Sequence, residues 1–390
     1  MKTWAVSLLA ALVVSLGACK KGSAPVDPGE ASPPSTAEQT ASPEALSPSA
    51  SEPPASEVLE HSDEDVDENI QAVTAPVDET PEASCGGAPL TVTFYDAGQA
   101  LAALVTLPDG TTILVDAGES PRRPGCGNAC KSWHRNVLNG LARDLGDRGI
   151  DMVWITHQHS DHLGGIPGIA RQFPIDLYID NGRNRNKSTV KRARAAAKKA
   201  GARLLAVHPR QRKVPQPADR EVQITPIVPQ KWPRACSGNP NNCSIGLLIT
   251  YCRSRILFTG DVEHEGEAVW PVGGLDIDLL QVSHHGADDA SSGPFLSQVH
   301  PEYAVVTCAD RNEGTNRGFC HPRQSVIERL TSGLGGPGSR TVETFDAARS
   351  CQNQTNSNWH QTPISDRLWV TSRDGEVSLR TLGDGTFTRF

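Results

Sequence analysis

Long hydrophobic runs are missing from this sequence of 390 residues. The apolar stretch that follows Met1 and Lys2 ends at Leu16, whereas a helix that crosses a bilayer needs about 20 predominantly apolar residues. We therefore expect the chain to have no integral transmembrane domain and to form no membrane channel by itself.

The short apolar run at the N-terminus is instead typical of a signal peptide. Its end, from Leu16 to Cys19, resembles a bacterial lipobox, which predicts a signal peptide at 1–18 and lipidation of Cys19. Several acyl chains on one cysteine anchor a protein lastingly to a membrane. We expect a lipid-anchored protein of the bacterial cell envelope, which faces the periplasm or is held at the outer membrane. Lys20, directly after the cysteine, favours the outer membrane. An ordinary signal peptide or a single-span anchor is the alternative.

Residues 19–85 lack any helix or strand period among their apolar positions. Pro, Ser, Ala and Glu dominate, and between residues 20 and 85 fifteen acidic residues face two basic ones, a net charge of −13. A segment of this kind repels itself and buries too little apolar surface to fold. The sequence predicts an extended linker there and one folded domain over residues 86–390, whose net charge is +4 although the whole chain is −8.

Cysteine pairs with CxxC spacing are absent, although the chain has ten cysteines. In an exported domain, the nine cysteines after Cys19 indicate up to four disulfides and one free thiol, with the connectivity left open. A cysteine-rich zinc site is the competing interpretation. The local pairings that we favour are Cys126–Cys130, Cys236–Cys243 and Cys308–Cys320.

Three imidazoles and one carboxylate fall within six residues directly after an apolar run at 152–155. The run predicts a short buried strand, with the cluster on the turn at its end. Side chains at i and i+2 of an extended segment point the same way, so His157 and His159 can bind one cation, and Asp161 with His162 can face a second. Neutral imidazole and carboxylate suit zinc or manganese, and a metal pair is a common hydrolytic device. A surface histidine cluster without metal is the alternative.

The HxHxDH motif after an apolar strand resembles the signature of the metallo-β-lactamase-fold hydrolases. Four flanking blocks, at 94–99, 113–118, 257–263 and 283–286, are similar to the soluble hydrolase domain of ComEC-type DNA-uptake proteins and stand in the same order. The resemblance runs from about residue 90 to about residue 380. It implies an α/β fold, an αββα sandwich in which two mixed sheets pack face to face, with helices outside and metals at one sheet edge.

By this resemblance, two divalent metal ions, zinc or else manganese, bind at that edge and lower the pKa of water toward neutrality. Asp161 is expected to orient the water or take its proton. One member of the pair His284 and His285 binds metal; we favour His284, which leaves His285 to contact a phosphoryl oxygen or protonate the leaving group. The ligands expected are His157, His159, Asp161, His162, Asp261 and His284.

Two further roles follow from the resemblance. Asp116, at the end of a buried strand, is expected to brace the metal loop without binding metal. His321 lies in a segment similar to the family's late Gly-His-Pro turn, where it lines the substrate cleft or serves the turn alone.

The third-motif histidine of many superfamily members is missing, because residues 241–244 are Asn, Asn, Cys and Ser. ComEC-type sequences also tend to have Asn and Ser at this place. One metal site is consequently poorer in nitrogen ligands, which keeps a single metal, or magnesium, open as alternatives.

Acidic residues are absent from 182–218, a segment with twelve lysines and arginines. Residues 187–202 are predicted to form a helix. Positive charges without acidic neighbours favour an anion-binding surface, above all for a nucleic-acid backbone. No aromatic residue in the segment can stack on bases, which argues against base-specific recognition. A solvated helix face is the alternative. The substrate-binding cations expected are Lys191, Arg192, Lys198 and Lys199.

Hydrophobic patterns place the remaining elements of the domain. Apolar residues at helical spacing predict helices at 133–145, 166–173 and 325–330. Strands are expected at 90–95, 102–107, 112–115, 177–179, 246–251, 255–259, 276–282, 303–307, 368–371 and 377–382.

Three classes of function fit these residues. The first is a phosphodiesterase or nuclease that acts on DNA or another anionic phosphoester outside the cytoplasm, and both the resemblance and the basic segment favour it. The second is a hydrolase of a β-lactam, lactone or thioester. The third is a non-catalytic binding lipoprotein with a vestigial metal site, which the missing third-motif histidine suggests.

Overall fold

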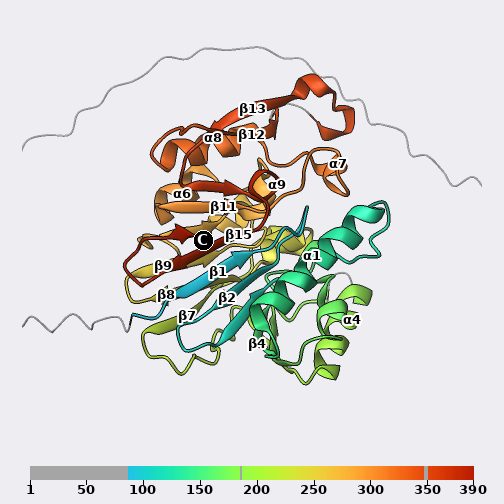
Figure 1. Cartoon of the computed structure of the whole chain (residues 1–390), viewed down its shortest axis with the longest axis vertical. Coiled ribbons are helices and arrows are strands. Elements are labelled where there is room, and N and C mark those ends of the chain that lie inside the picture. The colour runs from blue at the N-terminus through green and yellow to red at the C-terminus, as the bar shows by residue number, and fades with distance from the viewer. Residues whose placement is uncertain (1–86, 185–186, 347–349) are drawn as a thin grey trace, which may run out of the picture. The chain divides into compact units, whose positions relative to one another are not determined.

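Two β-sheets lie face to face in the computed structural model, which describes residues 87–184, 187–346 and 350–390 (Figure 1). These residues belong to one compact unit. The expected signal peptide at 1–18, the linker at 19–85 and the lipidated Cys19 lie outside the described residues. Across the described ranges, we find no helix with the length and apolarity that a membrane crossing requires.

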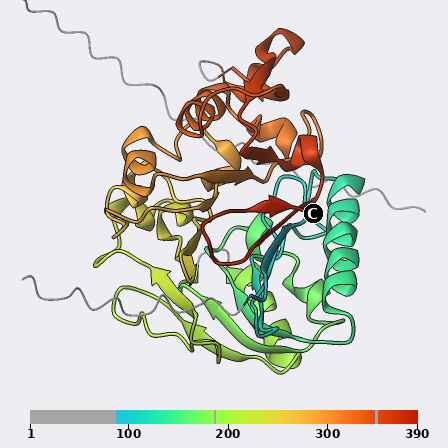
Figure 2. The same ribbon diagram turned by 60° about the vertical axis from the view of Figure 1, so that its left-hand side comes forward.

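The first sheet has eight strands. In spatial order they are β16 (Thr388–Arg389), β15 (Val377–Thr381), β1 (Leu90–Phe94), β2 (Ala103–Thr106), β3 (Thr112–Val115), β4 (Ile150–Trp154), β5 (Ile175–Asp180) and β6 (Arg203–Ala206). Strands β1 to β3 form an antiparallel meander, whereas β3 to β6 run parallel. The late strand β15 pairs with β1, so the first and last strands of the described chain share this sheet (Figure 2).

The second sheet has six strands. In spatial order they are β14 (Leu368–Val370), β11 (Tyr303–Val306), β10 (Leu279–Gln281), β9 (Ser254–Phe258), β8 (Gly246–Tyr251) and β7 (Val222–Ile227). Strands β7 to β9 are antiparallel, whereas β9, β10, β11 and β14 run parallel. A separate antiparallel ribbon joins β12 (Arg340–Phe345) to β13 (Trp359–Ile364).

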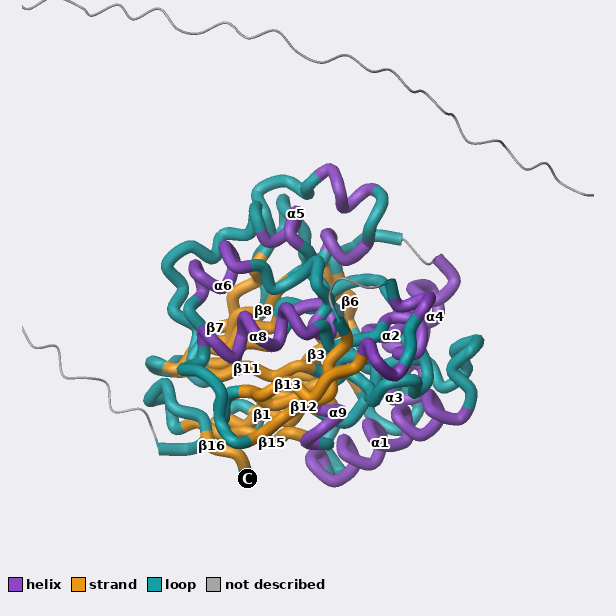
Figure 3. The backbone as a smooth tube through the Cα atoms, turned by 90° about the horizontal axis from the view of Figure 1, so that it is seen from above, coloured by secondary structure: helices purple, strands orange, loops and turns teal. Residues whose placement is uncertain are grey.

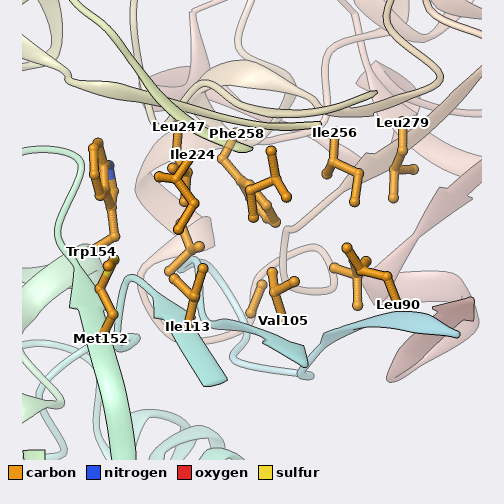
Figure 4. Close-up of a cluster of buried hydrophobic side chains, with 14 of the residues drawn as sticks. Leu90, Val105, Ile113, Met152, Trp154, Ile224, Leu247, Ile256, Phe258 and Leu279 are labelled. Carbon is orange, nitrogen blue, oxygen red and sulfur yellow. The ribbon is translucent and has the colours of Figure 1, made fainter. Parts of the chain in front are cut away.

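The main core fills the space between the two sheets. Alternate residues of β1, namely Leu90, Val92 and Phe94, point inward, as the period of two in a strand requires. Side chains such as Ile224 and Phe258 approach from the facing sheet (Figure 4). Each large apolar side chain buried in this way contributes roughly 1.5–3 kcal/mol to folding, so this layer fixes how the two sheets meet.

Helices cover the outer face of each sheet. A second core lies between the eight-stranded sheet and the helices α1 (Asn128–Leu145), α3 (Ile166–Ile169) and α4 (Lys187–Lys199). A third core lies between the six-stranded sheet and the helices α6 (Gly293–Val299) and α8 (Gln324–Gly333). Figure 3 shows α1, α3 and α4 gathered on one side of the strands. The order helix, sheet, sheet, helix confirms the predicted αββα sandwich.

Short helices occupy the loops between these elements. The α-helical turns are α2 (Ser160–Leu163), α5 (His264–Glu267), α7 (Asn316–Phe319) and α9 (Thr371–Asp374). The 3₁₀ turns are η1 (Arg234–Ser237), η2 (Pro240–Cys243), η3 (Ser283–Gly286), η4 (Cys351–Asn353) and η5 (Asn356–Asn358).

Three disulfides join pairs of cysteines that both lie in the described ranges. The predicted bridges Cys126–Cys130 and Cys236–Cys243 are confirmed. The predicted bridge Cys308–Cys320 is wrong, because Cys320 pairs with Cys351 and Cys308 is a buried free thiol. Cys320 follows α7 and packs with Phe345 and Trp359 of the β12–β13 ribbon, whereas Cys308 follows β11 and its backbone is held by Thr371.

Candidate metal centre

Parallel strands of both sheets bring polar side chains to one edge. The turn that holds the HxHxDH motif follows β4, Asp261 follows β9, and the pair at 284–285 follows β10. Gly260 has a φ of +60°, and a Cβ on it would lie 2.6 Å from the Thr156 side chain. Only glycine therefore lets the turn after β9 approach the turn after β4 so closely.

Asp261 lies at the centre of this edge. Its Oδ2 is 3.0 Å from His162 Nε2, 3.6 Å from His285 Nε2 and 3.8 Å from His157 Nε2. Among the described residues, Asp161, His162, Asp261 and His285 could hold one ion, and His157, His159 and Asp261 another. Asp261 is common to the two groups, as a carboxylate that bridges two metals would be.

Asp116 fixes the orientation of His162. Its Oδ2 lies 2.6 Å from His162 Nδ1, and Thr156 donates to the same carboxylate from its backbone N–H and its hydroxyl. These bonds turn His162 Nε2 toward Asp261, and they match the bracing role expected for Asp116. Burial opposes a charge on the ring, but the carboxylates of Asp261 and Asp116 together raise the pKa of His162 well above its usual value.

His285 has the geometry of a metal ligand. Its Nδ1 lies 2.7 Å from the carbonyl oxygen of Thr307, so that nitrogen is the donor and Nε2 keeps a lone pair directed at the edge. Burial lowers the pKa of His285, which favours the neutral imidazole that binds metal.

His284 is engaged elsewhere. Its Nδ1 lies 2.9 Å from Asp289 Oδ1, and its Nε2 lies 3.2 Å from Asn241 Nδ2. The geometry therefore favours His285 over His284 as the ligand, the reverse of the sequence-based expectation. Both residues have positive φ, near +50° and +55°, a conformation that costs non-glycine residues about 1–3 kcal/mol and that often marks a functional site.

His157 and His159 face each other across the second group. His157 Nε2 lies 3.1 Å from His159 Nδ1, and His157 Nδ1 lies 3.2 Å from the Thr156 hydroxyl. Burial lowers the pKa of His157 well below its usual value, so its ring is neutral and available to a cation.

Buried polar atoms without a hydrogen-bond partner indicate whether this edge fits a metal ion. Asp261 Oδ1 and His285 Nε2 are buried without a hydrogen-bond partner among the described residues. Leaving such an atom unsatisfied costs about 1–3 kcal/mol. Burial opposes the Asp261 charge, but the charge and the hydrogen bond of His162 hold the pKa of this carboxyl well below its usual range. Imidazoles around an ionised carboxylate are the donor set of zinc or manganese, and a bound cation would displace the proton that the raised pKa keeps on His162, so these residues fit divalent cations.

A family model described as the metallo-beta-lactamase superfamily matches residues 95–309. The chain belongs to the metallo-β-lactamase superfamily. This membership implies divalent metal binding and agrees with the sandwich and with the His/Asp groups at its edge.

Relatives and solved structures extend the comparison. Recombination protein 2 of Haemophilus influenzae is 28% identical, over 61% of this chain and 26% of that protein. Competence protein ComA of Neisseria gonorrhoeae is 27% identical, over 61% and 29%. The crystal structure of the metallo-beta-lactamase fold protein YhfI from Bacillus subtilis aligns with a TM-score of 0.39 at 16% identity, over 64% of this chain and 94% of that one. The chain thus spans about a quarter of the length of these two relatives.

The third-motif position of this superfamily member holds amides and no histidine. Asn241 and Asn242, in η2, are buried and donate to the carboxylate of Glu263. Asn241 Oδ1 and Ser244 Oγ are buried without a partner among the described residues. The structure therefore offers oxygen where many superfamily members offer an imidazole.

The expected substrate-binding cations lie on α4, which contacts α2 and α3. Arg192 lines a cavity together with Ser160 of the metal-binding turn. Lys191 and Lys198 line a different hollow, and Lys199 is exposed. Arg194 of the same helix is instead committed to Asp180, with Nε 2.7 Å from the carboxylate.

His321 is buried within a turn. Its Nδ1 is 3.0 Å from Gln99 Nε2, and its backbone N–H donates to Asn316 Oδ1. Its ring packs edge-on against His284, with the centroids 5.5 Å apart. These contacts fit the turn role that the sequence left open for it.

Glu119 is a buried carboxylate of the site that sequence reasoning missed. It accepts hydrogen bonds from the Ser120 backbone N–H at 2.6 Å and from the Ser160 hydroxyl at 2.9 Å. Burial, and then the nearby Asp161 charge, raise the pKa of Glu119 to about 7. Its place three residues after Asp116, on the loop beside the metal-binding turn, was the only available signal.

Proposed function

We propose that this chain is a metal-dependent phosphodiesterase that hydrolyses nucleic acid. The observation that supports this most is the packing of α4 against α2. This contact sets a helix rich in cations beside the turn that carries Asp161 and His162. The competence and recombination proteins among the relatives support the same substrate class.

The edge residues would hold two cations. One would lie among His157, His159 and Asp261, and the other among Asp161, His162, His285 and the shared Asp261. Bound divalent cations, zinc or manganese, supply Lewis-acid chemistry, lowering the pKa of water and offsetting the negative charge of the transition state.

The chain's own side chains orient the water and the substrate. Asp161, whose side chain is 19% exposed, orients the attacking water or takes its proton. His284 contacts a phosphoryl oxygen of the substrate, the role that the sequence suggested for His285. The His284 side chain is 18% exposed and is held by Asp289. Asp116 and the Thr307 carbonyl hold the two ligand rings in place.

A substrate panel tests this proposal. Purified protein, with its bound metal measured by elemental analysis, is offered single-stranded DNA, bis-p-nitrophenyl phosphate and nitrocefin. We expect turnover of both phosphodiesters that a chelator abolishes, and no turnover of nitrocefin. Hydrolysis of nitrocefin without hydrolysis of either phosphodiester would assign the site to acyl chemistry. Bound metal without any turnover would favour a binding protein.

The cellular setting is part of the proposal. A lipid on Cys19 would anchor the enzyme to the bacterial cell envelope, with the acidic segment at 19–85 holding the domain over 86–390 away from the membrane. Cys19→Ala should leave an unlipidated form. If this variant matures to the same mass and still partitions with membranes, the anchor is wrong.

A further inference from the structure

A cavity of about 390 Å³ opens beside the metal-binding turn. Its walls come from the loop after β3, from α2, from α3 and the segment that follows it, and from α4. Ser160, which stands between the candidate ligands His159 and Asp161, lines it. The cavity therefore reaches the turn that carries these two candidate ligands, and its size lies within the range of small-ligand sites.

Arginines dominate the charge of this cavity. Arg122, Arg123, Arg171 and Arg192 line it, and Glu119 is its one acidic lining residue. Within the described residues, Arg122, Arg171 and Arg192 take part in no ion pair. Three guanidinium groups from separate segments thus converge on one hollow without a carboxylate to neutralise them, which produces a positive potential there.

Glu119 does not cancel this potential, because its charge is already compensated. Arg123 Nε lies 3.7 Å from its carboxylate, and Arg123 Nη1 donates to the Ser160 hydroxyl at 2.7 Å. Ser160 and the Ser120 backbone donate to the same carboxylate. Glu119 therefore serves to hold Arg123 and the metal-binding turn together, which leaves the other three arginines for a ligand.

We infer that this cavity is a phosphate subsite, which binds the phosphodiester next to the one that is hydrolysed in a nucleic-acid strand. The inference rests on the proposed function and names a part of the substrate that the metal centre does not touch. Guanidinium groups bind phosphate in a bidentate way, and several converging on one pocket fit its oxygens better than lysines would. The lining contains no aromatic side chain, so the subsite holds backbone and does not recognise bases.

Two faces of α4 line different cavities, and only one of these cavities is the proposed phosphate subsite. Thr189 and Arg192 face the cavity beside the metal-binding turn, whereas Lys191 and Lys198 line the hollow on another side of the helix. The strand should therefore pass between α4 and the loop after β3, with Arg192 as the α4 cation that contacts the phosphate beside the scissile one.

The test compares two substrates in the full-length protein with its metal bound. A thymidine dinucleotide has a single phosphodiester, whereas a tetranucleotide has neighbouring ones. We expect Arg171→Gln/Arg192→Gln to lower the ratio of kcat/KM for the tetranucleotide to that for the dinucleotide roughly tenfold, since two charge-assisted contacts are lost. Arg135→Gln removes an exposed arginine of α1 outside the cavity; it is the control and should leave the ratio unchanged. An unchanged ratio in the double variant would overturn the subsite.

Direct binding separates failure of the subsite from failure of the proposed function. If neither substrate is hydrolysed, the anisotropy of a labelled tetranucleotide is measured with chelator-treated protein at several salt concentrations. Loss of the contact with this one phosphate should reduce the slope of log affinity against log salt by about 0.7, the value per phosphate on a single strand. An equal slope in the double variant and in Arg135→Gln would overturn the subsite, whereas a reduced slope would support it even without hydrolysis.

Inorganic phosphate, titrated calorimetrically at constant ionic strength, distinguishes a site for the free ion. Saturable binding of phosphate that Arg171→Gln/Arg192→Gln abolishes, together with an unchanged substrate ratio, would assign the cavity to free phosphate and overturn the strand assignment. Weak phosphate binding together with the expected fall in the ratio would support the strand.

Discussion

The carboxylate of Asp116 lies 2.6 Å from Nδ1 of His162 and turns the opposite ring nitrogen toward Asp261. Partners of this kind, which touch a ligand and not the metal, typically change metal affinity 10–100-fold when they are replaced. Asp116→Asn should therefore weaken metal binding by about that factor, as measured by competition with a chromophoric chelator. Asparagine tolerates the φ of +54° at this position, so the fold should persist.

Asp151→Asn is the matched control for that variant. Asp151 accepts hydrogen bonds from Thr112 at the other end of β4, and its loss should leave the metal affinity unchanged. Equal affinities for Asp116→Asn and the wild-type protein would show that His162 needs no such partner.

The second prediction concerns the adjacent histidines. His285→Gln should lose part of the bound metal, because Nε2 of His285 is the nitrogen directed at Asp261, whereas His284→Gln should keep the wild-type metal content. Elemental analysis of the two purified variants decides between them. Metal loss in His284→Gln alone would restore the assignment that the sequence favoured.

The third prediction concerns the disulfide between Cys320 and Cys351, which closes a loop with a sequence separation of 31 residues. Loop-closure entropy predicts that Cys351→Ser lowers the free energy of unfolding by about 3–4 kcal/mol, whereas Cys308→Ser, at a free thiol, should cost much less. Denaturant titration measures both, and peptide mapping without reduction identifies the bridge. A peptide that joins Cys308 to Cys320 would contradict the structure.

The fourth prediction concerns the cations of α4. If they follow a nucleic-acid backbone, reversing them to glutamate should flatten the salt dependence of DNA binding, because fewer counterions are released. The reversed set is Lys191, Arg192, Lys198 and Lys199. A control of equal charge reverses the exposed residues Lys131, Arg135, Arg220 and Lys231. Equal slopes for the two variants would remove α4 from the DNA-binding surface and leave the metal centre unaffected.

Much of the sandwich followed from the sequence, because its inner strands carry strong apolar patterns. The strands at 112–115 and 246–251 have the expected bounds. The strands that were missed carry weaker signals. Strand β7 contains Pro226, which lacks a backbone donor, and the sheet tolerates it because β7 is an edge strand. Strand β13 of the small ribbon contains Pro363, and half of its residues are polar.

The part of the site within one short motif was predictable, whereas the part that depends on distant contacts was not. Nothing local separates His284 from His285; the distinction comes from the carbonyl of Thr307 after β11 and from Asp289. Glu119 reaches the metal-binding turn because Gly165 has no side chain: a Cβ there would lie 1.9 Å from the carbonyl oxygen of Ala117. Contacts between residues that are far apart in the chain produce no periodic pattern in the sequence.

With two divalent metals bound, the edge around Asp261 should hydrolyse phosphodiesters. A chelator removes the metal from the protein, and hydrolysis of bis-p-nitrophenyl phosphate is followed as zinc or manganese is added back. Activity should be absent without metal and should rise to a plateau at about two equivalents per chain, one for each of the two groups that share Asp261. No hydrolysis at any metal content, with the metal demonstrably bound, would contradict this expectation.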